Sequence, residues 1–323
     1  MNQTVTPASV QDISRISQDV LAAVQRVVVG MEQPLTIALS AVLAGGHVLF
    51  EDLPGLGKTV AARSLAAALG LEFTRLQCTP DLLPADVTGS YVWDPSTREF
   101  SFRRGPVFTG LLLADEINRT SPRTQSALLE AMAEGQVSVE GTTYALPRPF
   151  HVIATSNPVE LEGTFPLPEA QLDRFMVRLS VGYLPVEAET QILLNRVARR
   201  QEATSVDQIV DAATVQAMQA GVEQIDVSPD IVTYCVRIAS ATRHHEDVEV
   251  GVSPRGTQAL LLLCRARAAI AGRDYIIPDD VHEAAPAALA HRLSLTARAW
   301  ASGVTGAQVI DSVLGSVPVP AVS

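Results

Sequence analysis

The stretch Leu53-Pro54-Gly55-Leu56-Gly57-Lys58-Thr59 decides the fold of this chain. A short apolar run at 47–50 precedes it, and a segment with helical periodicity at 59–69 follows it, so it joins a predicted buried strand to a predicted helix. The two glycines let the backbone approach a ligand closely and expose consecutive N–H groups, and the helix N-terminus adds positive potential. The stretch therefore predicts a phosphate-binding loop.

Each position of this loop has an expected role. Lys58 would reach the β- and γ-phosphates of a nucleotide, and the Thr59 hydroxyl would ligate Mg²⁺. The first position of the usual pattern is glycine, but Asp52 stands there, and its carboxylate could either repel phosphates or hydrogen-bond the loop. We predict ATP and Mg²⁺ as cofactors, bound by the remaining members of the cradle: Pro54, Gly55, Leu56, Gly57 and Val60.

The acidic pair Asp115-Glu116 follows a second apolar run at 111–114, which predicts a buried strand. A carboxylate at the end of such a strand is typical of the Walker B element of nucleotide hydrolases. Asp115 would hold Mg²⁺, directly or through water. Glu116 would orient or deprotonate the attacking water. With the loop, the pair predicts an ATP hydrolase.

Three further polar residues are candidates for the same site. Asn157 follows the predicted strand at 151–155 and could position the attacking water, although an asparagine before proline is also a common turn former. Arg174 could stabilise charge on the γ-phosphate of a neighbouring subunit. Arg255 begins a predicted helix and could point at phosphates from the second domain, although each arginine alone also fits an ordinary solvated or ion-paired side chain.

Strands and helices alternate through residues 1–182, which predicts a mostly parallel sheet between helices. Within this part, alternating apolar residues around Glu140-Gly141 predict a hairpin near 136–146. Beyond Gly182 strong strand signals are lacking, and residues 183–323 are expected to form a separate all-α domain whose tail after Ser302 packs loosely. The predicted helices of this domain span 186–200, 212–220, 229–242, 254–271 and 278–291.

The composition limits which partners and which cellular compartment are expected for this chain. The 323 residues are 47% hydrophobic and carry a net charge of -11, which favours a folded chain and makes nucleic acid an unlikely partner. Cys78, Cys235 and Cys264 are scattered, as expected of reduced thiols. An apolar run approaching the roughly 20 residues of a membrane helix is lacking, so a cytoplasmic protein is expected.

Together these stretches resemble the MoxR family of AAA+ ATPases, and the resemblance covers nearly the whole chain, from Val28 to Pro318. It rests on the loop 53–59 and on five further runs. These runs are 79–89 (TPDLLPADVTG), 111–119 (LLLADEINR), 124–132 (TQSALLEAM), 153–158 (IATSNP) and 167–175 (LPEAQLDRF).

The resemblance implies roles that the residues alone do not. It identifies Asn157 with the sensor 1 asparagine, Arg174 with the trans-acting arginine finger and Arg255 with the sensor 2 arginine. It places Val29 and Gly30 against adenine and makes the predicted hairpin the family's insert before sensor 1. It also implies a homo-oligomer, usually a hexameric ring, that acts as a chaperone-like remodeller, often with proteins bearing von Willebrand factor A domains.

Three other classes remain open at this point. A metal-chelatase motor subunit has a related AAA+ core and a similar insert. A DNA motor of the replicative-helicase type fits poorly with the acidic charge and with the absence of an added nucleic-acid domain. A nucleotide-gated scaffold would bind ATP without turning it over. Asp52 leaves this class open, but the presence of Glu116, Asn157 and Arg174 argues against it.

Overall fold

A five-stranded parallel sheet forms the centre of the molecule, as the alternation of strands and helices predicts. The computed structural model describes residues 5–158, 163–201 and 204–320. The strand order is β2-β5-β8-β1-β9, with every neighbouring pair parallel. The strands are β1 (Val48–Glu51), β2 (Phe73–Gln77), β5 (Leu111–Asp115), β8 (His151–Ser156) and β9 (Val177–Leu179).

Helices cover both faces of this sheet, which explains why its central strands read as continuous apolar runs. Along β5 the side chains alternate, so Leu111 and Leu113 join one apolar cluster while Leu112 and Ala114 join the other. The first cluster contains α1 (Val10–Gln25), α2 (Glu32–Leu43) and α3 (Lys58–Ala68), and the second contains α5 (Pro122–Glu134).

The predicted hairpin is present as β6 (Gln136–Val139) and β7 (Thr142–Ala145). Glu140 and Gly141 form its turn with φ angles of 48° and 81°. Two consecutive positive φ values are what a two-residue hairpin turn needs, because they match the twist of the flanking strands.

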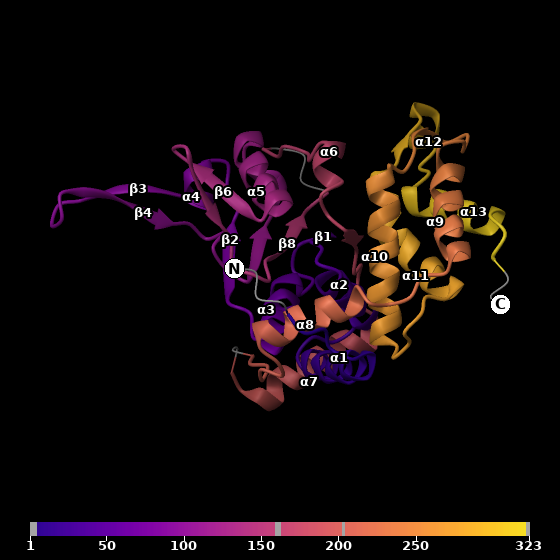
Figure 1. Ribbon diagram of the computed structural model, residues 1–323, viewed down its shortest axis with the longest axis horizontal. Helices are drawn as coiled ribbons and strands as arrows, with labels where there is room; N and C mark the ends of the chain where they lie inside the picture. Colours follow the sequence, from indigo (N-terminus) through magenta and orange to yellow (C-terminus); the bar gives the residue numbers. More distant parts are fainter. Residues whose placement is uncertain (1–4, 159–162, 202–203, 321–323) are drawn as a thin grey trace.

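A second hairpin, β3 (Gly89–Asp94) and β4 (Glu99–Arg104), is absent from the sequence-based expectations. It follows the short helix α4 (Pro84–Thr88) and reaches away from the body of the molecule (Figure 1). Its turn lacks glycine, and Arg98 takes the positive φ of 57° instead, so the usual hairpin signal is missing. Phe102 of β4 stacks on Tyr144 of β7 with ring centroids 4.1 Å apart, which joins the two hairpins at their bases.

The C-terminal part contains the five predicted helices: α7 (Val186–Arg199), α8 (Ala212–Val222), α9 (Pro229–Thr242), α10 (Pro254–Ile270) and α11 (Pro278–Leu289). It is not purely helical, because β10 (Val248–Val250) pairs antiparallel with β11 (Ser294–Leu295). The expectation of a loose tail after Ser302 is wrong. After α12 (Ala297–Ala301), helix α13 (Gly306–Ser316) buries a stripe of four side chains: Val309, Ile310, Val313 and Leu314.

The C-terminal helices, called the lid below, pack tightly against the sheet domain. Helix α10 lies beside α1 and α2, and α11 lies against β9 (Figure 1). Helix α8 also packs on α1 and α2, so the predicted boundary near 182 falls where the chain leaves β9 but not where contacts with the sheet domain end. Among the described residues, no helix has both the length and the apolar character needed to cross a bilayer.

Candidate nucleotide-binding and hydrolysis site

The predicted phosphate loop connects β1 to α3, in the context that its sequence requires. Gly55 and Gly57 have φ angles of 84° and 80°, a region that suits glycine because it has no Cβ. Gly57 is the N-cap of α3, and no side chain accepts a hydrogen bond at this helix start. The first N–H groups of α3 are therefore available to an anion, with Thr59 and Val60 in the same first turn.

Lys58 lies buried within the curve of this loop. Its Nζ donates to the carbonyl oxygens of Asp52, at 2.8 Å, and Leu53, at 3.0 Å. Burial lowers the pKa of Lys58, and the charges of Asp52, Asp115 and Glu116 oppose that shift. The ammonium group is thus preorganised at the loop and sits within electrostatic range of both acidic residues of the Walker B pair.

The carboxylate of Asp52 hydrogen-bonds protein backbone, which decides between its two sequence-based interpretations. Its Oδ1 accepts from the Leu53 N–H at 3.1 Å. Its Oδ2 accepts from the N–H groups of Val181 and Gly182, the latter at 3.0 Å, and from the Ser180 hydroxyl at 3.3 Å. Asp52 therefore ties the phosphate loop to the segment that leaves β9 and leads to the lid.

Replacement of Asp52 by alanine should destabilise the protein without tightening ATP binding. The change leaves the N–H groups of the half-buried Val181 and Gly182 without their acceptor, a loss of about 1–3 kcal/mol in the free energy of unfolding. Urea denaturation and titration with a non-hydrolysable ATP analogue measure the two effects, with Glu130→Gln on the exposed face of α5 as control. Unchanged stability together with tighter analogue binding would instead indicate that Asp52 repels phosphates.

Asp115 is held in place from both sides by residues of the neighbouring strands. The Thr155 hydroxyl of β8 donates to Asp115 Oδ1 at 2.7 Å. Arg75 of β2 donates to Oδ2 through Nε at 3.1 Å and through Nη2 at 2.6 Å. The carboxylate is therefore fixed at the carboxyl end of the sheet, where open α/β folds bind their ligands.

Glu116 occupies a left-handed backbone conformation, with φ 60° and ψ 51°, that is costly for a residue other than glycine. Its N–H donates to Thr155 Oγ1 at 2.8 Å. Its side-chain Oε2 accepts from Gln77 Nε2 at 2.9 Å and lies 3.3 Å from Arg119 Nε. This conformation turns the carboxylate away from the strand direction, and its polar contacts hold it there.

The sequence alone does not identify Arg75, Gln77 and Thr155 as members of this site. Their signal is the polar end of two strands, in FTRLQ at 73–77 and HVIATS at 151–156. In the sheet, Gln77 is directly opposite Asp115, and Arg75 is two residues earlier on the same side of β2. Without the strand order, nothing in the sequence indicates that β2 adjoins β5.

The donor set at this edge fits Mg²⁺ bound together with a nucleotide. Asp115 and Thr59 offer oxygen ligands, which are the ligands that Mg²⁺ prefers. Among the described residues, no cluster of three or more His, Cys, Asp or Glu side chains could hold a metal by itself. Mg²⁺ bound with a nucleotide usually takes one or two protein ligands and completes its shell with phosphates and water.

Asn157 lies at the end of β8 and is buried. Its backbone is clasped by Asn118, whose Nδ2 donates to the Asn157 carbonyl at 3.1 Å and whose Oδ1 accepts from the Asn157 N–H at 3.4 Å. Both asparagines line a cavity of about 350 Å³ together with Glu51. Asn157 thus directly follows the central strand β8, which lies between β5 and β1.

Gly30 packs beside Leu184 and Ala188, which follow residues 180–182, the hydrogen-bond partners of Asp52. A Cβ at Gly30, whose φ is 78°, would lie 2.9 Å from a Leu184 methyl carbon and 3.2 Å from the Ala188 Cβ. The half-buried Val29 precedes it. Thus Val29 and Gly30, the predicted adenine contacts, lie beside the start of α7, close to the chain segment that Asp52 holds.

The two candidate arginines lie where the lid meets the sheet domain, Arg174 in the segment after α6 (Glu169–Leu172) and Arg255 in the first turn of α10 (Pro254–Ile270). Arg174 donates from Nη1 to the Leu129 carbonyl at 2.6 Å. Arg255, half exposed at the start of α10, lies 3.8 Å from a carboxylate oxygen of Asp173, the residue before Arg174. Within the described chain, no hydrogen bond or ion pair connects Arg255 to the loop 53–59.

Arg292 of the lid hydrogen-bonds the residues on both sides of Arg174, and the sequence alone does not single it out. Its side chain is only 3% exposed. It donates to the Asp173 carbonyl at 3.0 Å, to the Asp173 carboxylate and to the Phe175 carbonyl at 2.7 Å. The residue belongs to η2 (Ala290–Arg292), and nothing in the sequence distinguishes it from a surface arginine.

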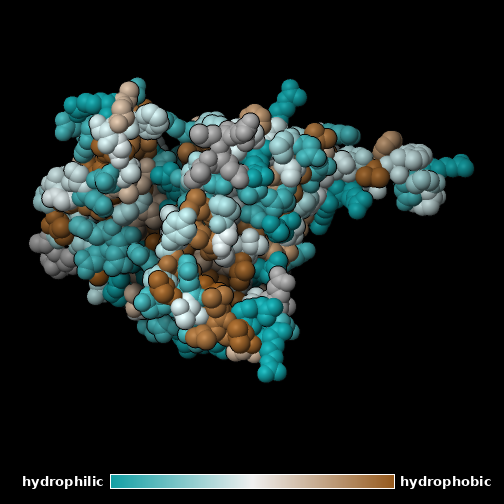
Figure 2. All heavy atoms as spheres, turned by 180° about the vertical axis from the view of Figure 1, so that it is seen from behind, coloured by the Kyte–Doolittle hydropathy of each residue, from teal (hydrophilic) through white to brown (hydrophobic). Residues whose placement is uncertain are grey.

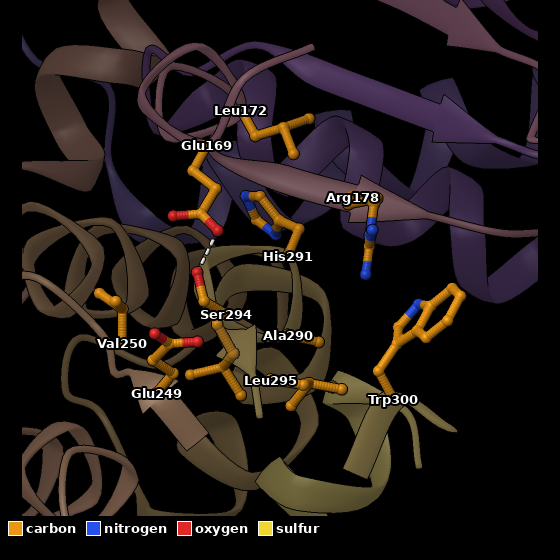
Figure 3. A pocket seen from close by; sticks show the side chains of 12 residues that line it. Glu169, Leu172, Arg178, Glu249, Val250, Ala290, His291, Ser294, Leu295 and Trp300 are labelled. Carbon is orange, nitrogen blue, oxygen red and sulfur yellow. Dashed lines mark hydrogen bonds between the residues drawn. The ribbon is translucent and has the colours of Figure 1, made fainter. Parts of the chain in front are cut away.

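A cavity of about 590 Å³ opens beside this contact, between α6 and β9 on one side and η2 and β11 on the other (Figure 3). On its wall, the Ser294 hydroxyl donates to the Glu169 carboxylate across the two domains. His291 lies beside it with Nε2 3.1 Å from the Phe175 carbonyl, and burial lowers its pKa to about 3, so it is neutral. The lid is therefore bonded to both ends of the segment 169–175 that carries Arg174.

Comparison with known proteins identifies both parts of the chain. The profile of the ATPase family associated with various cellular activities (AAA) matches residues 47–177, and the AAA lid domain profile matches residues 240–313. The sheet with its phosphate loop is thus an AAA domain, and residues 240–313 of the C-terminal part form an AAA lid.

Relatives and a solved structure cover nearly the whole chain. The uncharacterized protein YeaC of Bacillus subtilis is 43% identical over 96% of this chain and 97% of its own length. Chaperone MoxR1 of Mycobacterium tuberculosis is 40% identical over 93% of this chain and 81% of its own length. The crystal structure of a candidate ATPase from Cytophaga hutchinsonii has a TM-score of 0.90 at 36% identity, covering 97% of both chains.

The chelatase alternative has weaker support. A magnesium-chelatase 38 kDa subunit of Acidiphilium rubrum is 30% identical, but over only 57% of this chain and 53% of its own length. By the profile matches and the relatives that span it from end to end, this chain belongs to the MoxR family of AAA+ ATPases.

Proposed function

We propose that this chain binds Mg·ATP at the loop 53–59 and hydrolyses it with the Walker B pair. The loop N–H groups and Lys58 would hold the phosphates. When bound, Mg²⁺ would supply charge neutralisation at the β- and γ-phosphates, held by Thr59 and Asp115. Glu116, kept in position by Gln77 and Arg119, would orient the attacking water and accept its proton.

Asn157 and the contacts around Asp115 would set the geometry of this reaction. Asn157 is held at the end of β8 by Asn118, where its amide would help to orient the water. Thr155 bonds both the Asp115 carboxylate and the Glu116 N–H, so that one hydroxyl fixes the two acidic residues relative to each other. Positioning of this kind is a main source of catalysis in phosphoryl transfer.

We further propose that the site is completed by a neighbouring copy in a homo-oligomeric ring, most simply a hexamer. The observation that carries this proposal is that Arg255 pairs with Asp173, the residue before Arg174, and that within the described residues it has no bond to the loop of its own chain. Two arginines at this partly exposed segment suit a phosphate presented by another subunit. In this proposal Arg255 contacts the nucleotide of the neighbouring subunit and not the nucleotide bound by its own chain.

ATP turnover measured across a range of protein concentrations tests this proposal. If a neighbour supplies Arg174 and Arg255, the rate per subunit should rise with concentration as oligomers form, in parallel with the oligomer fraction from sedimentation velocity. A full rate per subunit in a sample that sediments as monomer would contradict the shared site. Absence of turnover at every concentration would contradict hydrolysis itself.

The work performed by hydrolysis is proposed to be the remodelling of protein partners. The relative MoxR1 is named a chaperone, and the family resemblance points to partners with von Willebrand factor A domains. The same turnover assay tests this: a purified von Willebrand factor A protein of the same organism should change the ATP turnover rate and be retained by the Glu116→Gln variant with ATP. A partner that binds equally well without nucleotide would contradict ATP-driven remodelling.

A further inference from the structure

One face of α7 is apolar and uncovered. None of the residues of this helix is buried. Val186, Leu193 and Val197 are 75%, 66% and 72% exposed, and with Leu194 they follow the spacing i, i+7, i+8, i+11 of a single helical stripe. Figure 2 shows apolar spheres gathered in this region, at the lower edge of the molecule. A stripe of this kind is typical of a helix that packs against something.

The lid has an uncovered apolar groove between α9 and α10. This groove has a volume of about 630 Å³ and includes Val232 and Val236, which are 41% and 51% exposed. Leu261 and the buried Cys235 complete its apolar floor. Figure 1 places α9 and α7 in different regions of the molecule, so the groove is not covered by the α7 of its own chain.

The start of α7 and the rim of the groove carry charges of opposite sign. The first turn of α7 carries Glu187 and Glu189, beside the apolar stripe, while Arg196 and Arg199 lie in its last turn, at the other end of the helix. The groove is bordered by the exposed Arg243 and Arg255. Arg243 is fixed at the groove because its Nε donates to the Val252 carbonyl at 2.9 Å. An acidic helix start with an apolar stripe therefore matches a basic rim with an apolar floor.

Each surface also lies next to one half of the proposed shared site. Helix α7 begins four residues after Gly182, which donates to Asp52 of the phosphate loop, and its Ala188 lies beside Gly30. The groove contains Arg255, which pairs with Asp173 next to Arg174. If these arginines reach a neighbour's phosphates, the groove must come close to the neighbour's α7.

We propose that the apolar face of α7 docks into the α9–α10 groove of a second copy of this chain. The contact is head to tail, since it joins two different surfaces, and it repeats around a ring. It rests on the proposed shared site, and it specifies which elements bring the arginines of one subunit to the loop of the next.

Disulfide trapping between two differently sized full-length versions tests this contact. One version carries Leu193→Cys and the other Val236→Cys, both in a Cys235→Ala background; the remaining native cysteines are buried. Mild oxidation should give a covalent product between the two versions. A product only between two Leu193→Cys chains would mean that α7 pairs with α7, and no product at all would mean that the groove holds something else; either result overturns the proposal.

A charge exchange supplies the matched control without any cysteine. Glu187→Arg with Glu189→Arg should raise the concentration needed for half-assembly by about tenfold or more, and Arg243→Glu added to the same chain should recover much of that loss. No weakening, or weakening without recovery, overturns the contact. Neither experiment depends on hydrolysis, so a chain that assembles this way but does not turn over ATP would refute the proposed function alone.

Discussion

Glu116→Gln should lower the ATP turnover rate by at least about 100-fold while ATP still binds, because general-base catalysis is typically worth 10²–10⁴-fold in rate. The substitution keeps the shape of the side chain and its ability to accept a hydrogen bond from Gln77, whose amide now lies 2.9 Å from Glu116 Oε2. It removes the charge that would orient and deprotonate water. Lys58 and the loop backbone are untouched, so the affinity for ATP should change little.

The matched control for this variant is Glu130→Gln on α5, which removes one exposed carboxylate from the same part of the chain. Steady-state phosphate release gives the turnover rate, and equilibrium binding of a fluorescent ATP analogue gives the affinity. Equal rates for wild type and Glu116→Gln would remove Glu116 from the mechanism. A loss of binding that matches the loss of turnover would mean that the substitution damages the loop.

Arg292→Lys should lower ATP turnover by roughly tenfold to 100-fold, because displacing a catalytic group by about 1 Å can cost that much. Lysine keeps the buried positive charge near Asp173, but it cannot reach both the Asp173 and Phe175 carbonyls that Arg292 bridges at 3.0 and 2.7 Å. Arg174, which lies between those two residues, would lose the support that fixes its backbone. Arg292 never contacts the reacting groups, so it is a positioning residue.

Three measurements distinguish positioning from general damage in this variant. The affinity for an ATP analogue should match that of wild type, because the loop of the same chain is intact. The control Arg298→Lys replaces an exposed lid arginine that pairs with Glu246 and Asp247, and it should leave turnover unchanged. A thermal unfolding midpoint near wild type confirms folding. Wild-type turnover in folded Arg292→Lys would show that Arg174 needs no support from the lid.

The core of the fold was predictable because its signals are local. Buried parallel strands appear as apolar runs such as 111–114, and the loop with its glycines fixes a strand before it and a helix after it. The β3–β4 hairpin was missed because Arg98, not glycine, takes the positive φ in its turn. The Gly, Val and Pro content of the tail predicts loose packing, but the spacing of Val309, Val313 and Leu314 is that of a buried helical face.

A residue of the candidate site was predictable only where a single local sequence motif defines its role. The motifs identify Lys58 and the acidic pair, but not the strand order that puts Arg75 beside Asp115. Asp52 could be read in two ways, since its bonds to residues 180–182 cross about 130 positions of sequence. From the sequence, Arg255 is expected to complete the site of its own chain. In the structure it pairs with Asp173, and this pairing depends on how the lid packs against the sheet domain, which no local sequence pattern encodes.

The central claim is that two subunits share one hydrolysis site, and mixing two inactive variants tests it most directly. Lys58→Ala removes the loop lysine but keeps Arg174, and Arg174→Ala does the reverse. In an equimolar mixture some interfaces combine an intact loop with an intact arginine, so ATP turnover should recover to a substantial fraction of wild type while each variant alone stays inactive. A mixture that forms mixed oligomers but remains as inactive as its components would contradict the shared site.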